Sequence, residues 1–213
     1  MSEDVPAVPV REVPPAGRRS RRLMAVSLTL AGVVVVADQA TKQLAQAHLV
    51  EGRSQPLVGD LLRLTLYYNP GAAFGIAGTL TPLLALIAVA VAVAVVRAAR
   101  RLGSVGWTVG LGLLLGGAVG NLVDRLVREP GFGRGHVVDF LDLPNLFVFN
   151  LADAAITSAA VIIAVLGLRG IGPDGVRTTR AEQAAAEQTS PEQTTPEQTS
   201  PEQTTPEETP RDA

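Results

Sequence analysis

Four apolar stretches constrain this chain more than any other feature. Each is close to the ~20 residues that an α-helix needs to cross about 30 Å of hydrocarbon. They are centred on residues 23–47, 79–99, 105–123 and 151–169. The sequence therefore predicts an all-α polytopic membrane protein built as a four-transmembrane-helix bundle, and four crossings place both termini on one side.

The composition agrees with a membrane protein and excludes several kinds of chemistry. The chain is 47% hydrophobic and only 18% charged, a balance that suits a membrane protein better than a soluble one. It has no cysteine, which excludes disulfides, thiol nucleophiles and thiolate metal sites. The two histidines, His48 and His136, lie far apart and offer no ligand spacing. We expect no metal, no cofactor and no nucleic-acid partner.

Two tails flank the predicted membrane domain of residues 23–170. Residues 1–22 end in RRSRR and contain no apolar stretch, so we expect a disordered cytoplasmic tail. Residues 171–213 carry the repeat EQTSP EQTTP, which has no apolar residue for a core and predicts a second disordered tail. The eight acids of residues 181–213 leave the rest of the chain mildly basic.

The arginines predict the orientation, because short cytoplasmic loops collect Lys and Arg. Five arginines lie in the N-terminal tail, three in residues 97–101 and three in residues 169–180. The connection at 50–78 has two and that at 125–150 has three, so the bias is modest. It predicts a multi-pass protein of the bacterial cytoplasmic (inner) membrane with both termini cytoplasmic.

Two features near the first apolar stretch affect this topology. Residues 23–37 and the small-residue site at 45–47 resemble a cleaved signal peptide, but Asp38 and Lys42 fall between them and favour an uncleaved helix. The following connection alternates in places, as LLRLTLYYN, and predicts short strands on the outer side.

Ionisable residues inside the spans are the first functional signal, since each costs at least ~2.5 kcal/mol on insertion scales. Asp38 and Lys42 are four residues apart on one helical face and are expected to pair. Asn121 and Asp124 share a face of the glycine-rich third stretch, and Arg125 adds a positive charge beside them. A simple ion pair or a packing seam would explain either group taken alone.

Two more acids lie near the start of the fourth stretch. Asn150 and Asp153 fit an N-cap with an acid at the third helical position, which suits the helix dipole. Asp139 lies in the preceding connection among apolar neighbours, where a loop acid is usually just solvated. The four acids nevertheless converge on one outer level, which is harder to explain structurally than any single residue.

Carboxylates are the only reactive groups that the motifs offer, because the chain lacks G-x-S-x-G, H-E-x-x-H and a phosphate loop. Two nearby carboxylates share a proton, so that one activates a water and the other acts as an acid. Asp38 beside Lys42 and Asp124 beside Arg125 are expected to stay ionised. This chemistry favours Asp139 and Asp153 as the pair.

Five ordered motifs among four helices resemble those of lipoprotein signal peptidase, also called signal peptidase II. They are DQATK (38–42), NPGAAFGI (69–76), GGAVGNLVDR (116–125), VVDF (137–140) and FNLADAAI (149–156). The resemblance covers about residues 23–169. It implies a four-helix membrane bundle with a small extracytoplasmic β-cradle, for which residues 50–70 are the candidate. Pro70 departs from the often polar family position, and the segment 140–152 is short.

The family's implied reaction is an aspartic endopeptidase cleavage at the outer membrane face. It removes the signal peptide of bacterial prolipoproteins just before a cysteine that carries a diacylglyceryl group, so the implied partners are these substrates and membrane lipid. The catalytic dyad carries over to Asp139 and Asp153. Positions that shape or support the site carry over to Asp38, Lys42, Asn69, Gly71, Asn121, Asp124, Arg125 and Asn150.

Two other classes of function remain as alternatives. A small proton-coupled transporter would also carry intramembrane acids, but it should place them at several depths. A non-catalytic adaptor would use the repeat tail, and deletion of residues 171–213 distinguishes it from a peptidase.

Overall fold

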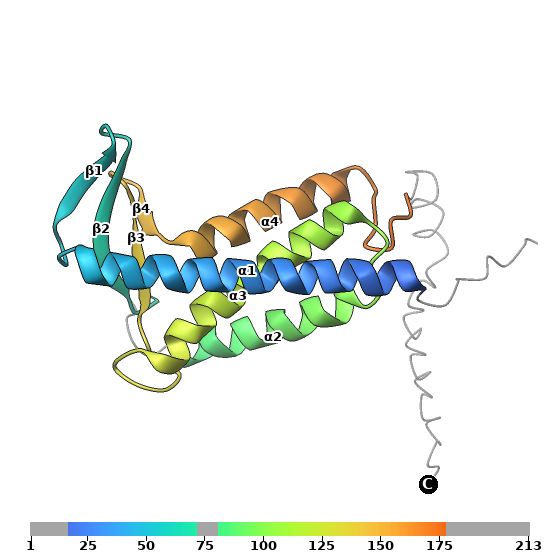
Figure 1. Ribbon diagram of the computed structural model, residues 1–213, viewed down its shortest axis with the longest axis horizontal. Coiled ribbons are helices and arrows are strands. Elements are labelled where there is room, and N and C mark those ends of the chain that lie inside the picture. Colours follow the sequence, from blue (N-terminus) through green and yellow to red (C-terminus); the bar gives the residue numbers. More distant parts are fainter. Residues whose placement is uncertain (1–16, 72–80, 178–213) are drawn as a thin grey trace, which may run out of the picture. The chain divides into compact units, whose positions relative to one another are not determined.

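The computed structural model describes residues 17–71 and 81–177 (Figure 1). Its elements in chain order are α1 (Arg18–His48), β1 (Ser54–Val58), β2 (Leu62–Asn69), α2 (Thr81–Ala99), α3 (Val105–Val127), β3 (Val137–Leu143), β4 (Phe147–Phe149) and α4 (Leu151–Leu168). Within the described ranges, four helices are long and apolar enough to cross a membrane. The strands form one small sheet at an end of the bundle (Figure 1). The predicted four-helix membrane fold with a small β-cradle is confirmed.

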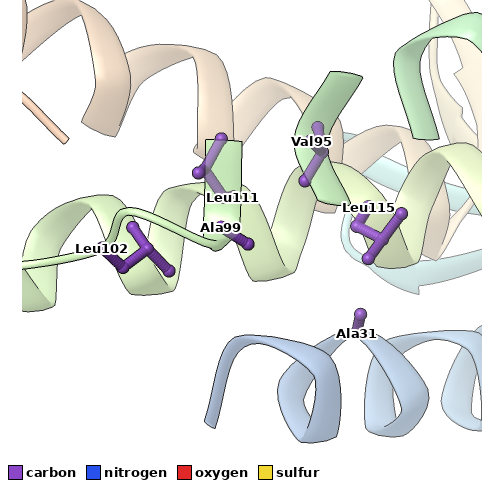
Figure 2. Packing of buried hydrophobic residues seen from close by; sticks show 6 residues of the cluster. All are labelled: Ala31, Val95, Ala99, Leu102, Leu111 and Leu115. Atoms are coloured by element: carbon purple, nitrogen blue, oxygen red, sulfur yellow. The ribbon is translucent and has the colours of Figure 1, made fainter. Parts of the chain in front are cut away.

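Helix α3 lies at the centre of the bundle and packs against α1, α2 and α4. Its glycines make close approach possible: a Cβ on Gly116 would lie 2.6 Å from Val34 of α1, and one on Gly117 would lie 2.5 Å from the carbonyl oxygen of Ala152 in α4. The predicted glycine seam therefore holds two helices against α3. Figure 2 shows the apolar core that α1, α2, α3 and the α2–α3 connection share.

Helix α1 is longer than the bilayer requires. Its 31 residues span about 45 Å, against about 30 Å of hydrocarbon. At its C-terminal end Ala45 packs with Leu66, Val138 and Phe140 of the sheet. The C-terminal end of α1 therefore packs against the sheet.

The sheet is antiparallel in the order β1-β2-β3-β4, with α2 and α3 inserted between β2 and β3. Residues 50–70 supply β1 and β2, as predicted, while β3 and β4 come from a segment expected to be a connection. Tyr67 pairs with Asp139 and Leu141 with Phe149 in the ladder. The expectation that Asp139 lies in a loop is therefore wrong, since it lies in a central strand.

The described structure continues on both sides of residues 23–170. Helix α1 begins at Arg18, and Ser20 Oγ donates to the Arg100 carbonyl at 2.9 Å. After α4, residues 171–177 turn back on α3: Trp107 Nε1 donates to the Ile171 carbonyl at 2.7 Å. The division into residues 1–22, 23–170 and 171–213 stays a prediction. Residues 1–16 and the repeats lie outside the described residues.

Candidate active site

Asp139 is held at the centre of β3 with only 1% of its surface exposed. Both of its carboxylate oxygens accept a hydrogen bond from a side-chain amide. Asn69 Nδ2, at the end of β2, donates to Oδ2 at 2.9 Å, and Asn150 Nδ2 donates to Oδ1 at 2.6 Å. The sheet and the start of α4 thus fix this carboxyl group from two sides.

Asp153 lies in the first turn of α4, where it completes a capping box with Asn150. Asn150 Oδ1 accepts from the Asp153 amide at 3.0 Å, and Asp153 Oδ2 accepts from the Asn150 amide at 3.3 Å. The predicted N-cap is confirmed. Capping leaves Oδ1 of Asp153 available, and it accepts from Asn121 Nδ2 of α3 at 2.7 Å.

Asn150 connects the two aspartates directly, because its side chain donates to Asp139 and its backbone donates to Asp153. The side-chain Nδ2 of Asn150 also donates to Asn121 Oδ1 at 3.2 Å. Asparagine suits this position since one side chain carries both donors and an acceptor. The hydrogen bonds that connect Asp139 and Asp153 therefore come from amides.

Burial raises the pKa of Asp139 to about 6, from its ordinary 3.8. Desolvation is the main cause, and the charge of Asp153 acts in the same direction. The hydrogen bonds from Asn69 and Asn150 and the charge of Lys42 oppose it but are outweighed. A carboxyl group poised near neutral pH can hold a proton and release it, as an acid catalyst requires.

A second group of acids lies beside the first and is organised around Lys42. Lys42 Nζ is 2.8 Å from Asp38 Oδ2 and 2.8 Å from Asp124 Oδ2, and all three side chains are fully buried. It also donates to Asn121 Oδ1 at 3.0 Å. Asp38 Oδ1 accepts from the Ala152 amide at 3.0 Å, at the N-terminus of α4. The predicted Asp38–Lys42 pair is confirmed, but it includes Asp124 as well.

The salt bridges of Asp124 involve other cations than the expected Arg125. Among the described residues they are with Lys42 and with Arg128, whose Nε is 2.7 Å from Oδ1. Arg125 forms no salt bridge with Asp124 in residues 17–71 and 81–177, although its charge interacts with those of Asp139, Asp124 and Asp153, and its Nη1 is buried with no hydrogen-bond partner in the described chain. Consecutive residues on a helix point in different directions, whereas residues four apart share a face.

The sequence reasoning missed two further residues of this second group. Arg128 also donates to Gln46 Oε1, and Gln39 Nε2 bridges Asp38 Oδ2 at 3.2 Å and Asp124 Oδ1 at 3.1 Å. The spacing of four between Asp124 and Arg128 was a usable signal. Gln39 offered none, because an uncharged residue beside an acid is unremarkable.

Gly71 supports the site through the backbone of the β2 end. Its φ of 95° lies in the left-handed region, and its amide donates to Asn69 Oδ1 at 2.8 Å. That bond turns the Asn69 amide nitrogen toward Asp139. The rest of the NPGAAFGI motif, residues 72–76, lies outside the described residues.

Residues 17–71 and 81–177 contain no group of three or more His, Asp or Glu side chains arranged to hold a metal ion. A water-activating carboxylate pair needs none, and the metal-free mechanism stays a prediction.

The chain matches a family model described as signal peptidase (SPase) II over residues 30–169. Curated relatives named lipoprotein signal peptidase agree. One from Rhodococcus jostii (strain RHA1) is 48% identical over 67% of this chain and 71% of its own length. Another from Mycobacterium avium (strain 104) is 44% identical over 75% of this chain and 87% of its own.

Two solved structures of bacterial membrane enzymes share the fold. One has a TM-score of 0.61 and 28% identity and covers 68% of this chain and 94% of that one. The other has a TM-score of 0.60 and 29% identity over 68% of this chain and 88% of its own. Both matches exceed half of this chain, so the likeness extends beyond single motifs.

Proposed function

Because the chain belongs to the signal peptidase II family of membrane aspartic peptidases, we propose that it cleaves diacylglyceryl-modified bacterial prolipoproteins just before the lipidated cysteine. Its family and the names of its relatives support removal of signal peptides from prolipoproteins. The proposed requirement for the lipid is supported by the position of the site among helices long and apolar enough to cross a membrane, where an acylated substrate could reach it. Membrane lipid and these precursors are the proposed partners.

Asp139 and Asp153 are the proposed catalytic dyad, and their surroundings assign different roles to them. Buried Asp139, with its pKa raised to about 6, holds the shared proton. Asp153 is less buried and accepts hydrogen bonds from Asn121 Nδ2 and the Asn150 backbone amide, so it lies nearer to an entering water. Asp153 is therefore the general base and Asp139 the general acid.

The proposed reaction is an ordinary peptide hydrolysis. Asp153 takes one proton from a water while the hydroxide adds to the scissile carbonyl carbon. Asp139 then gives its proton to the leaving nitrogen, and the carbon–nitrogen bond breaks. The proton on Asp153 returns to Asp139 when the products leave, through a pair that one asparagine already connects.

The remaining polar residues position the dyad. Asn121 is central, since it touches Lys42 on one side and Asp153 on the other. A fixed Lys42 ammonium thereby orients the Asn121 amide toward the base. We propose the same supporting role for Asn69, Gly71 and Asn150, whose hydrogen bonds converge on Asp139.

The proposed topology places both termini in the cytoplasm and the dyad at the outer face. The α2–α3 connection and the start of α1 are rich in arginine and lie at the end of the bundle opposite the sheet (Figure 1). The dyad lies at the sheet end, where a scissile bond at headgroup depth would meet it. The scissile bond of a diacylated substrate must lie at that depth, because its acyl chains stay in the lipid.

Mass measurement of the product tests the function most directly. The full chain is incubated in reconstituted membranes with a diacylglyceryl-modified prolipoprotein, and the unmodified precursor serves as the control. We expect one cut immediately before the lipidated cysteine and little cleavage of the control. Equal cleavage of both precursors would contradict the proposed requirement for the lipid. Absence of cleavage of either precursor would contradict the proposed substrate class. Family membership as an aspartic peptidase leaves no specific support for the transporter alternative.

A further inference from the structure

A groove between α2 and α3 lies away from the dyad. Its volume is ≈ 440 Å³, within the range of small-molecule sites. Seven residues line it, five apolar and two arginines: Ala92, Val93, Val96, Arg97, Arg100, Leu115 and Val119. None of them takes part in the hydrogen bonds of Asp139 or Asp153 described above, so the proposed reaction leaves this groove unexplained.

The apolar part of the groove has a packed floor and an open side. Leu115 of α3 is buried, and Val95 and Ala99 of α2 meet it in the core (Figure 2). On the outer side Val93 and Val96 remain 45% and 37% exposed. The exposed side chains of a membrane-spanning helix face acyl chains, so the groove opens laterally to lipid.

The two arginines give the groove a charged end. Arg97 lies in the last turn of α2 (Thr81–Ala99), and Arg100 follows in the turn directly after the helix, where its backbone amide donates to the Arg97 carbonyl at 3.3 Å. Both are exposed, and neither forms an ion pair with an acid of the described chain. The α1 start, with four more arginines in residues 18–22, is tied to this end through the hydrogen bond from Ser20 to Arg100.

We propose that this groove binds one anionic phospholipid. An acyl chain lies along Val93, Val96 and Val119, and the phosphodiester meets the guanidinium groups of Arg97 and Arg100. Basic pockets between membrane helices are suited to such headgroups, and each Arg near an anionic surface contributes about 1 kcal/mol. A belt of arginines alone would attract any anionic lipid loosely, whereas a groove beside two of them predicts a single saturable site.

Titration of the purified full chain with phosphatidylglycerol tests the proposal, with bound lipid counted by native mass spectrometry. Phosphatidylcholine with the same chains is the neutral comparison. The charge variant is Arg97→Gln with Arg100→Gln, and its matched control is Arg53→Gln with Arg134→Gln, two exposed arginines outside the groove. We expect the charge variant to lose phosphatidylglycerol affinity on the order of 25-fold, from about 1 kcal/mol per arginine, and the control to lose little.

A second variant tests the apolar part independently of charge. Ala92→Phe fills the groove, and Ala94→Phe adds the same ring to an exposed α2 position that does not line it. We expect only Ala92→Phe to abolish the saturable phosphatidylglycerol site, and we expect peptidase activity to survive because the groove is remote from the dyad.

Four results would overturn the proposal. They are equal binding of the two lipids, equal losses in the charge variant and its control, unchanged binding in Ala92→Phe, and full displacement of the lipid by inorganic phosphate. The last result would mean that the arginines bind a free anion and that the apolar groove contributes nothing.

Discussion

Two groups of acids lie side by side at one end of the helix bundle, and they differ in the groups that contact them. Asp38 and Asp124 surround Lys42, with both contacts at 2.8 Å and no solvent exposure. Asp139 and Asp153 instead accept hydrogen bonds from the amides of three asparagines, Asn69, Asn121 and Asn150. A direct contact with a cation favours the charged carboxylate strongly, whereas at Asp139 desolvation outweighs the amide hydrogen bonds and raises the pKa.

This difference separates structure from chemistry among residues that look alike in sequence. The Lys42 group ties α1 to α3 and, through the Ala152 amide, to the start of α4. It is a junction of three helices whose charges must stay as they are. The asparagine-held pair lies on β3 and α4, where its proton can move. Substitutions of Asp139 or Asp153 should therefore mainly lower cleavage, whereas substitutions in the Lys42 group should mainly lower stability.

The largest expected effect is on cleavage by the asparagine-held pair. Asp139→Asn and Asp153→Asn each remove a proton-transfer group, so we expect cleavage of a diacylglyceryl-modified prolipoprotein to fall at least about 10³-fold, while the protein stays folded. Product mass, measured in reconstituted membranes, gives the rate, and thermal unfolding gives the fold. Full activity in either variant would exclude that residue from the dyad.

The next largest effect is the loss of the junction. Lys42→Met leaves two buried carboxylates near each other without their common cation, which should lower the free energy of unfolding by about 3–5 kcal/mol. Thermal unfolding of the full chain in detergent, followed by the fluorescence of the single tryptophan, measures it. Arg63→Met, which breaks the exposed pair with Asp60, is the control and should change little. Equal stability of Lys42→Met and the wild type would contradict the assigned role.

How far the sequence predicted this contrast depends on the distance between partners along the chain. Asp38 and Lys42, four apart on one helix, and the capping box of Asn150 with Asp153 were both predicted, because local spacing defines them. The contact between Lys42 and Asp124 joins two helices far apart in sequence, and no spacing rule reveals it. For Asp124 the sequence pointed to the adjacent Arg125, whereas the arginine that forms a salt bridge with it is Arg128, four residues after Asp124.

The sequence likewise predicted only part of the sheet. The alternation of apolar and polar residues in LLRLTLYYN predicted β2, and the four apolar runs predicted the helices. β3 was missed because Val137, Val138, Asp139 and Phe140 are all buried, so the strand has no alternating pattern to read. β4 is only three residues long. A strand buried on both sides and a very short one are the two kinds that periodicity detects worst.

A smaller effect should appear in the dependence of stability on pH. Asp139 has a folded pKa of about 6 against an ordinary 3.8, so the folded state binds its proton more tightly. Stability from this group is therefore present at low pH and is lost as pH rises from about 4 to about 6, by up to about 3 kcal/mol. Unfolding of the wild type and of Asp139→Asn, compared at each pH from 4 to 8, isolates the term because other groups titrate in both.

The expected difference curve has a clear sign. The wild type should lose stability relative to Asp139→Asn between pH 4 and pH 6, and the difference should then level off. A curve that rises with pH would mean that Asp139 is stabilised as a carboxylate, like Asp124, and the distinction between the two groups would disappear.

The smallest effect should come from changing the amide that joins the pair while keeping the helix cap. Asn150→Ser retains an oxygen acceptor for the Asp153 amide but loses the donor to Asp139 Oδ1, so stability should change by about 1 kcal/mol or less. That donor lowers the pKa of Asp139, and its loss should raise it. Since the protonated acid is the active form, the alkaline limb of the pH profile of kcat/KM should move to higher pH.

The control is Ser104→Ala, which removes the cap of α3 and should leave the alkaline limb in place. An unmoved limb in Asn150→Ser would show that the amide serves only the helix cap, and the proton of the pair would then be controlled by burial alone.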